Sequence, residues 1–194
     1  MQEEIVLGVY REKIDKYLIK NFIEDENLYN IILDNISSME RHIAEENKSF
    51  KQIIPYLFIK CNDEYLVYRR TKKQTEGRLH EKLSLGIGGH INPIDTESHN
   101  IITGGLEREL IEELGLNTND SLKFIGFIND DSNEVGKVHL GVVFKMEIDN
   151  KIDDVVEKQK MTLDWYYIDQ IYTDIDRFET WSQILFRNLI STEK

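Results

Sequence analysis

The sequence predicts a layered fold of the α/β or α+β class. Two observations support this: short β-prone runs alternate with segments of helical periodicity, and neither a repeat nor a low-complexity tract interrupts them. With 194 residues, of which 40% are hydrophobic, the chain has the length of one domain and enough apolar content for a core. We therefore expect strands and helices packed in layers.

The first 50 residues differ from the rest of the chain. They are rich in charge, and their apolar residues recur at three- and four-residue steps, at Leu28, Ile31, Ile32 and Ile36. This spacing is typical of a helix. We expect residues 1–50 to form an N-terminal helical or irregular extension, and residues 51–194 to form the main domain, including a last helix.

Short apolar runs after Gln52 predict strands. Residues 53–59 and 65–68 flank the polar segment Cys61-Asn62-Asp63-Glu64, and two β-prone runs around a short polar turn predict a hairpin. Pro55 cannot donate to a strand ladder, which favours a sheet edge or a strand start. Further strands are expected at 124–128, 138–148 and 165–168.

Two helices are expected in the second half of the chain. The first runs from Thr103 to Leu114 and ends at Gly115, the residue type best able to adopt the left-handed C-terminal cap conformation. The second is predicted by apolar residues that share one helical face, namely Phe178, Trp181, Leu185 and Leu189. This last helix is expected to dock on the core.

Composition argues against several functions. The chain has 24 Lys and Arg against 36 Asp and Glu, a formal net charge of −12, and an acidic surface repels nucleic-acid phosphates. Its apolar runs are shorter than the roughly 18–20 residues of a membrane span, and its acidic start is unlike a secretory signal. The single Cys61 excludes an internal disulfide and a cysteine-cluster zinc site. We expect a cytoplasmic protein without nucleic-acid or membrane partners.

The predicted helix 103–114 carries a cluster of carboxylates. Glu109, Glu112 and Glu113 fall within one arc of the helix, beside a stripe of leucines. Like charges at these spacings weaken a helix by a few tenths of a kcal/mol per pair, and a hard divalent cation with oxygen ligands would offset that repulsion. The alternative interpretation is a solvated helix face.

Two glycine pairs lie near this cluster. Gly88-Gly89 belongs to a glycine-rich turn whose bare backbone can approach a ligand or metal closely. Gly104-Gly105 lies inside the predicted helix, where each glycine costs about 1 kcal/mol relative to alanine. The second pair therefore indicates tight packing, for which ordinary contact with a loop is a sufficient explanation.

Gly89 followed by Arg108-Glu109-Leu110-Ile111-Glu112-Glu113-Leu114-Gly115-Leu116 resembles the Nudix box, in which a glycine and a glutamate precede Arg-Glu-apolar-any-Glu-Glu-any-Gly-apolar. The second half matches at every specified position. Eighteen residues separate Gly89 from Arg108, where the family usually has 13. The family glutamate eight residues before the arginine falls on Asn100, and Glu97 lies nearby as a replacement.

The wider segments 51–56 and 83–91 resemble a little-characterised branch described as predicted MutT-family phosphoesterases. The resemblance implies a Nudix-like α/β/α sandwich on a mixed β-sheet over about residues 50–170. It also implies a hydrolase that uses Mg²⁺ or Mn²⁺ to cleave a phosphoanhydride bond in a nucleoside diphosphate linked to another moiety. Because many relatives pair, a homodimer is a further expectation.

The resemblance assigns roles by position. Glu109, Glu112 and Glu113 would be catalytic metal ligands, the Gly89 carbonyl a further ligand, and Arg108 would brace a box carboxylate. Many relatives take another base or ligand from a later loop, for which Glu157 is the first candidate and Glu134 the second; a surface glutamate is the alternative for both.

A basic segment precedes the glycine turn. We expect one or two of its arginines to hold substrate phosphates, with Arg69, Arg70 and Arg78 as candidates. A solvated charged loop is the alternative. His90 could approach the site, although a lone histidine is more often a hydrogen-bonded structural residue, and the same holds for His139.

Two other functions are open on the same scaffold. One is a nucleotide-metabolite-binding module that has lost catalysis, against which the intact box glutamates argue. The other is a prenyl diphosphate isomerase, which needs a catalytic cysteine near a glutamate. Cys61, at a predicted hairpin turn, is poorly placed for that role.

Overall fold

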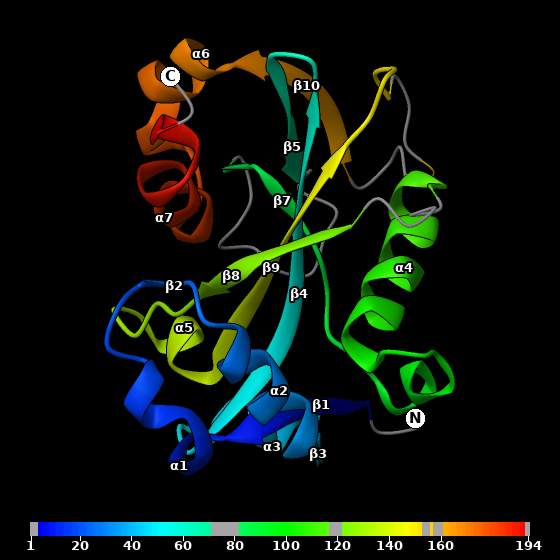
Figure 1. Cartoon of the computed structure of the whole chain (residues 1–194), viewed down its shortest axis with the longest axis vertical. Helices are drawn as coiled ribbons and strands as arrows, with labels where there is room; N and C mark the ends of the chain where they lie inside the picture. The colour runs from blue at the N-terminus through cyan, green and yellow to red at the C-terminus, as the bar shows by residue number, and fades with distance from the viewer. Residues whose placement is uncertain (1–3, 71–81, 117–121, 153–155, 157–160, 193–194) are drawn as a thin grey trace. The chain divides into compact units, whose positions relative to one another are not determined.

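The computed structural model describes residues 4–70, 82–116, 122–152, 156 and 161–192. The chain forms two compact units. Figure 1 labels their helices and strands. The first unit comprises residues 1–56, 88–106 and 124–143, and the second comprises residues 57–87, 107–123 and 144–194. Three long elements contribute to both units: β4 (Phe50–Cys61), α4 (Ile101–Leu114) and β9 (His139–Glu147). The mixture of strands and helices confirms the predicted α/β class.

The first 50 residues contain more strand than the sequence predicted. Their elements are β1 (Ile5–Tyr10), α1 (Arg11–Ile14), β2 (Phe22–Ile23), α2 (Glu26–Asp34), β3 (Ser37–Glu40) and α3 (Arg41–Ala44). Strand β1 runs antiparallel to β3, where Gly8 faces Ser37, and to β4, where Gly8 faces Gln52. These partners lie far along the chain, so helical periodicity alone did not indicate the strands. The division at residue 50 remains a prediction.

The rest of the first unit is built on β8 (Lys123–Ile128), β9 and the short helix α5 (Glu134–Val138). The hydrogen-bonded strand order is β4-β9-β8-β2, and β2 pairs antiparallel with β8. The strands predicted at 124–128 and 138–148 are thus confirmed. Fully buried core side chains of this unit include Val9, Leu28, Ile53, Ile91 and Phe127.

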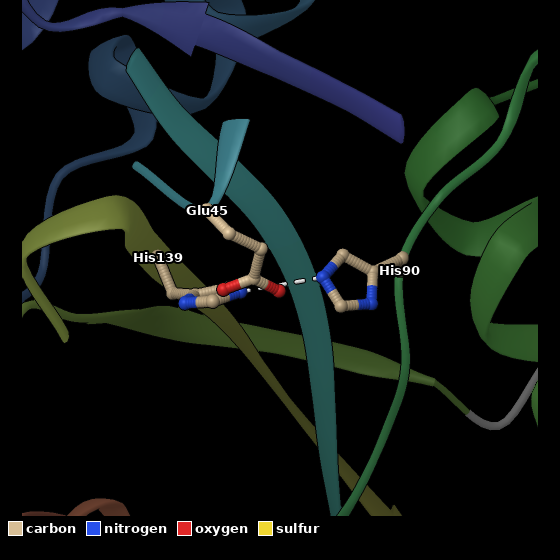
Figure 2. A group of neighbouring side chains, drawn as sticks. All are labelled: Glu45, His90 and His139. Atoms are coloured by element: carbon tan, nitrogen blue, oxygen red, sulfur yellow. Dashed lines mark hydrogen bonds between the residues drawn. The ribbon is translucent and has the colours of Figure 1, made fainter. Parts of the chain in front are cut away.

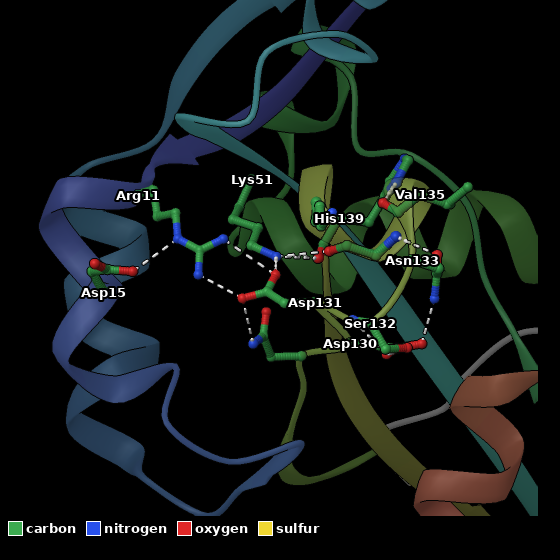
Figure 3. A network of polar contacts seen from close by, with 12 residues as sticks. Arg11, Asp15, Lys51, Asp130, Asp131, Ser132, Asn133, Val135 and His139 are labelled. Atoms are coloured by element: carbon green, nitrogen blue, oxygen red, sulfur yellow. Dashed lines mark hydrogen bonds and ion pairs between the residues drawn. The ribbon is translucent and has the colours of Figure 1, made fainter.

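A buried ion-pair network ties the segment before β9 to β4 (Figure 3). Lys51 is 0% exposed, and its Nζ donates to Asp131 Oδ1 and to the Gly136 carbonyl, each at 2.7 Å. Arg11 donates to both carboxylate oxygens of Asp131. Burial raises the pKa of Asp131, but the hydrogen bonds from Arg11 and Lys51 outweigh burial and lower it to about 2. Asp131 is therefore ionised at neutral pH.

The second unit contains β5 (Glu64–Arg70), β6 (Leu83–Ser84), β7 (Gly86–Ile87), β10 (Met161–Tyr167), α6 (Ile168–Asp174) and α7 (Thr180–Asn188). Strand β5 pairs antiparallel with β10 along its whole length. The predicted hairpin joins β4 to β5, with Cys61 opposite Glu64. Asn62 turns the chain with a φ of 52°, which asparagine tolerates better than most residues.

The prediction for Pro55 was wrong, because this residue lies in the interior of β4. Residues 50–52 of β4 pair with β1, and residues 57 and 58 pair with β7. Pro55 lies between these two stretches, outside the residues that pair with β1 or β7.

Both predicted helices are present. Helix α4 begins before Thr103 because the Asn100 side chain accepts hydrogen bonds from the N–H groups of Ile102 and Thr103 at 3.0 and 3.3 Å. It ends at Gly115, whose φ is 68°. The predicted C-terminal helix is α7, in which Leu185 is fully buried. Among the described residues, no helix combines the length and apolar character needed to cross a membrane.

Candidate active site

The three box glutamates lie on the part of α4 that belongs to the second unit. Glu109 and Glu113 are one turn apart; the Glu109 side chain is 17% exposed and Glu113 is 9% exposed. The Glu112 side chain is 58% exposed. Leu110, fully buried on the same helix, sets this rotation. Two carboxylates are therefore held close to the protein interior, while the third faces solvent.

Arg108 neutralises part of this negative charge. Its Nη1 donates to Glu109 Oε1 at 2.6 Å and lies 3.7 Å from Glu112 Oε2. This contact fixes the Glu109 carboxylate and offsets the repulsion between like charges on the helix. At the end of the helix, the N–H of Val156 donates to the Glu113 carbonyl at 3.0 Å.

The glycine turn belongs to the first unit, and its tightest point is Gly88. A Cβ at Gly88 would lie 1.8 Å from the Pro55 carbonyl oxygen, so a larger residue cannot fit without moving β4. The next residue, Gly89, is half-buried. Its role as a metal ligand remains a prediction.

Gly104 and Gly105 pack against the preceding loop. A Cβ on Gly104 would lie 1.9 Å from Ser98 Oγ, and one on Gly105 would lie 2.4 Å from a side-chain carbon of Ile91. Ordinary close packing against a loop, as weighed from the sequence, is therefore the explanation for this pair.

The five extra residues of the box fall in the loop before α4. That loop contains a short 3₁₀ helix, Pro93–Glu97. Asn100, at the position of the family glutamate, caps α4 through its side-chain oxygen. Asparagine is favoured at such a cap. The side chain of Glu97 lies outside the described residues.

Of the remaining predicted residues, the structure describes the side chains of Arg69 and Glu134. Arg69 is exposed on β5, opposite Thr162 of β10. Glu134 is exposed, and hydrogen bonds from Lys137 and Lys48 lower its pKa to about 2. The Arg70 side chain, Arg78 and Glu157 lie outside the described residues.

His90 meets two residues that the sequence analysis did not connect to it. Its Nε2 lies 3.2 Å from the Nε2 of His139, and Glu45 completes a group whose ligand atoms all lie within 4.8 Å of one another. No regular spacing links these three positions in the sequence, so no sequence signal could have found the group. Cys61, by contrast, is 1% exposed in β4, which leaves it inaccessible to a substrate.

Comparison with known proteins gives a relative that is similar in sequence and relatives among the solved structures. No family model matches the chain. Protein YmaB of Bacillus subtilis (strain 168) is 40% identical over 154 residues, which cover 76% of this chain and 75% of YmaB.

The solved structures show the family. Tm1382, described as a candidate Nudix hydrolase, is 29% identical and superposes with a TM-score of 0.80 over 97% of this chain and 99% of its own. A MutT protein from Methanosarcina mazei Go1 is 19% identical, with a TM-score of 0.54 over 74% of this chain and 96% of its own, and shares the fold. Together with the complete second half of the box, the match to Tm1382 over nearly the whole of both chains shows that this chain belongs to the Nudix hydrolase superfamily.

Proposed function

We propose that this hydrolase is a metal-dependent pyrophosphohydrolase. It cleaves a phosphoanhydride bond in a nucleoside diphosphate linked to another moiety. The observation that carries the proposal is the pair of glutamates one turn apart on α4, Glu109 and Glu113, both largely withdrawn from solvent.

The donor set at this pair fits a hard divalent ion. Withdrawing two carboxylates from water is costly unless cations or hydrogen bonds compensate them. Arg108 compensates one oxygen of Glu109. Carboxylate oxygens are the ligands that Mg²⁺ and Mn²⁺ accept readily. We therefore assign Glu109 and Glu113 as the main ligands and the more exposed Glu112 as an outer ligand, with the Gly89 carbonyl as a further candidate.

A bound Mg²⁺ or Mn²⁺ would neutralise charge developing on phosphate oxygens and lower the pKa of a coordinated water. The side chains of the protein hold the ligands in position. Arg108 holds the Glu109 carboxylate in one orientation through the 2.6 Å contact. This role needs no contact between Arg108 and the substrate.

Other positions supply substrate contacts in this proposal. Arg69, exposed on β5, together with Arg70 and Arg78, would bind phosphates, because guanidinium groups can pair with them bidentately. Glu157 remains the first candidate for an additional base or ligand.

The test is a panel of nucleoside diphosphate derivatives assayed with Mg²⁺, Mn²⁺ or a chelator, with products separated by chromatography. We expect turnover of at least one compound, dependent on the metal. The variant E113Q should lower kcat by about two orders of magnitude or more, because it removes a charge that acts in the transition state.

E107Q is the matched control, since Glu107 is exposed on the same helix and is not assigned to the site. It should retain wild-type kcat. Wild-type activity in E113Q, or equal losses in E113Q and E107Q, would reject the assignment. Tight binding of a nucleotide without turnover under any metal condition would instead favour a binding module.

A further inference from the structure

Three potential metal-ligating side chains converge in the first unit, on residues separate from the box carboxylates (Figure 2). Glu45 directly follows α3, His90 follows the glycine turn, and His139 is the first residue of β9. One ligand atom from each residue lies within 4.8 Å of the other two. Figure 2 shows the two imidazole rings and the carboxylate pointing toward one another.

The distance between the two histidines matches a shared metal ion. The Nε2 atoms of His90 and His139 are 3.2 Å apart. Two nitrogen ligands about 2.0–2.1 Å from a tetrahedral zinc ion lie about 3.3 Å apart. The rings meet edge to face, with an interplanar angle of 64° and centroids 5.4 Å apart. Both Nε2 atoms can therefore face one ion without a large rearrangement.

The surroundings of His139 favour the protonation state in which its Nε2 can bind a metal. His139 Nδ1 lies 2.8 Å from the Val135 carbonyl, which only accepts, so Nδ1 carries the proton and Nε2 keeps its lone pair. Zinc-ligating histidines usually donate a hydrogen bond of this kind from the ring nitrogen that does not bind the metal.

The polypeptide around His139 is also held in place. Lys51 Nζ donates to the His139 carbonyl at 3.3 Å as well as to Asp131 and Gly136 (Figure 3). Glu45 is held less firmly: its side chain is 36% exposed and lies 3.6 Å from Arg41. The two imidazoles are therefore the preorganised ligands, and Glu45 is the adjustable one.

We propose that Glu45, His90 and His139 bind one divalent transition-metal ion of the zinc class. Imidazole nitrogen suits zinc, cobalt and nickel better than it suits magnesium. Three protein ligands leave a fourth position for water, and the ion would join α3, the glycine turn and β9. The proposal is independent of the function assigned to the box.

The probe is Zn²⁺ or Co²⁺ alone, titrated into the full-length chain after treatment with a chelator. We expect one Zn²⁺ per chain at this site by calorimetry, a rise in Tm on binding, and the visible absorption of tetrahedral Co²⁺. H90Q and H139Q should each lower Zn²⁺ affinity at least tenfold and abolish the Co²⁺ absorption. E45Q should weaken binding less.

H42Q is the matched control, because His42 lies on α3 with its side chain 66% exposed. It should bind like wild type, and E113Q should keep the Co²⁺ absorption of the histidine site. If H139Q fails to fold, the Zn²⁺ affinities of H90Q and E45Q still test the proposal. The proposal is overturned if H90Q binds Zn²⁺ as tightly as wild type, if wild type gives no Co²⁺ absorption, or if E113Q alone loses it.

Discussion

Removing the negative charge of Asp131 tests whether the buried Lys51 needs this carboxylate as its counterion. Lys51 is 0% exposed and depends on Asp131 as its charged partner, while two backbone carbonyls accept its remaining hydrogen bonds. The variant D131N keeps the shape of the side chain and removes its charge. The ammonium group would then stay buried without a counterion, which is the costly situation.

The magnitude follows from the exposure of the two partners. Exposed ion pairs contribute about 0–1 kcal/mol, whereas removing one partner of a buried pair costs about 3–5 kcal/mol. Because the Asp131 side chain is 32% exposed and Lys51 is not exposed, we expect D131N to cost about 2–3 kcal/mol. With a urea slope of about 2–3 kcal/mol per molar, the midpoint of unfolding falls by about 1 M.

Urea unfolding of D131N, K51M and the double variant measures this effect. K51M removes the ammonium that needs Asp131, so the double variant should be destabilised less than the sum of the single variants, with a coupling of about 1–2 kcal/mol. E134Q is the control, since the Glu134 side chain is 69% exposed and pairs with Lys48 and Lys137 at the surface. A midpoint in D131N equal to that of E134Q, or strictly additive single effects, would refute the argument.

Three further predictions concern stability. Because the pKa of Asp131 is lowered to about 2 from an ordinary 3.8, its contribution is complete above pH about 4 and is lost as the pH falls toward 2; melting curves at successive pH values should show this loss in wild type and a smaller one in D131N. G88A should lower the free energy of unfolding, measured in urea, by at least about 2 kcal/mol, because its Cβ would overlap the Pro55 carbonyl. G115A should cost about 1–2 kcal/mol, because Gly115 has a φ of 68°. A loss in G88A no larger than that in G115A would contradict this prediction. N100A should lose about 1 kcal/mol through the missing cap of α4, whereas N100D should retain it; equal midpoints for wild type and N100A would show that the cap contributes nothing.

Features that depend on neighbours in the chain were readable from the sequence. The box glutamates, the glycine that ends α4 and the hairpin turn at Asn62 lie within a few residues of the groups they act on. Helical spacing alone places Glu109 and Glu113 one turn apart. The exposure of each carboxylate to water could not be predicted from the sequence, because neighbouring segments determine burial.

Features that depend on distant partners needed the tertiary structure. Strand β1 pairs with residues of β3 and β4, and Lys51 finds Asp131 eighty positions along the chain. Its positive charge in an apolar run gives no indication of complete burial. The meeting of Glu45, His90 and His139 is of the same kind. Local periodicity predicts which face of a helix or strand a side chain occupies. The residue that it contacts across that face is determined only when the strands pair and the core forms.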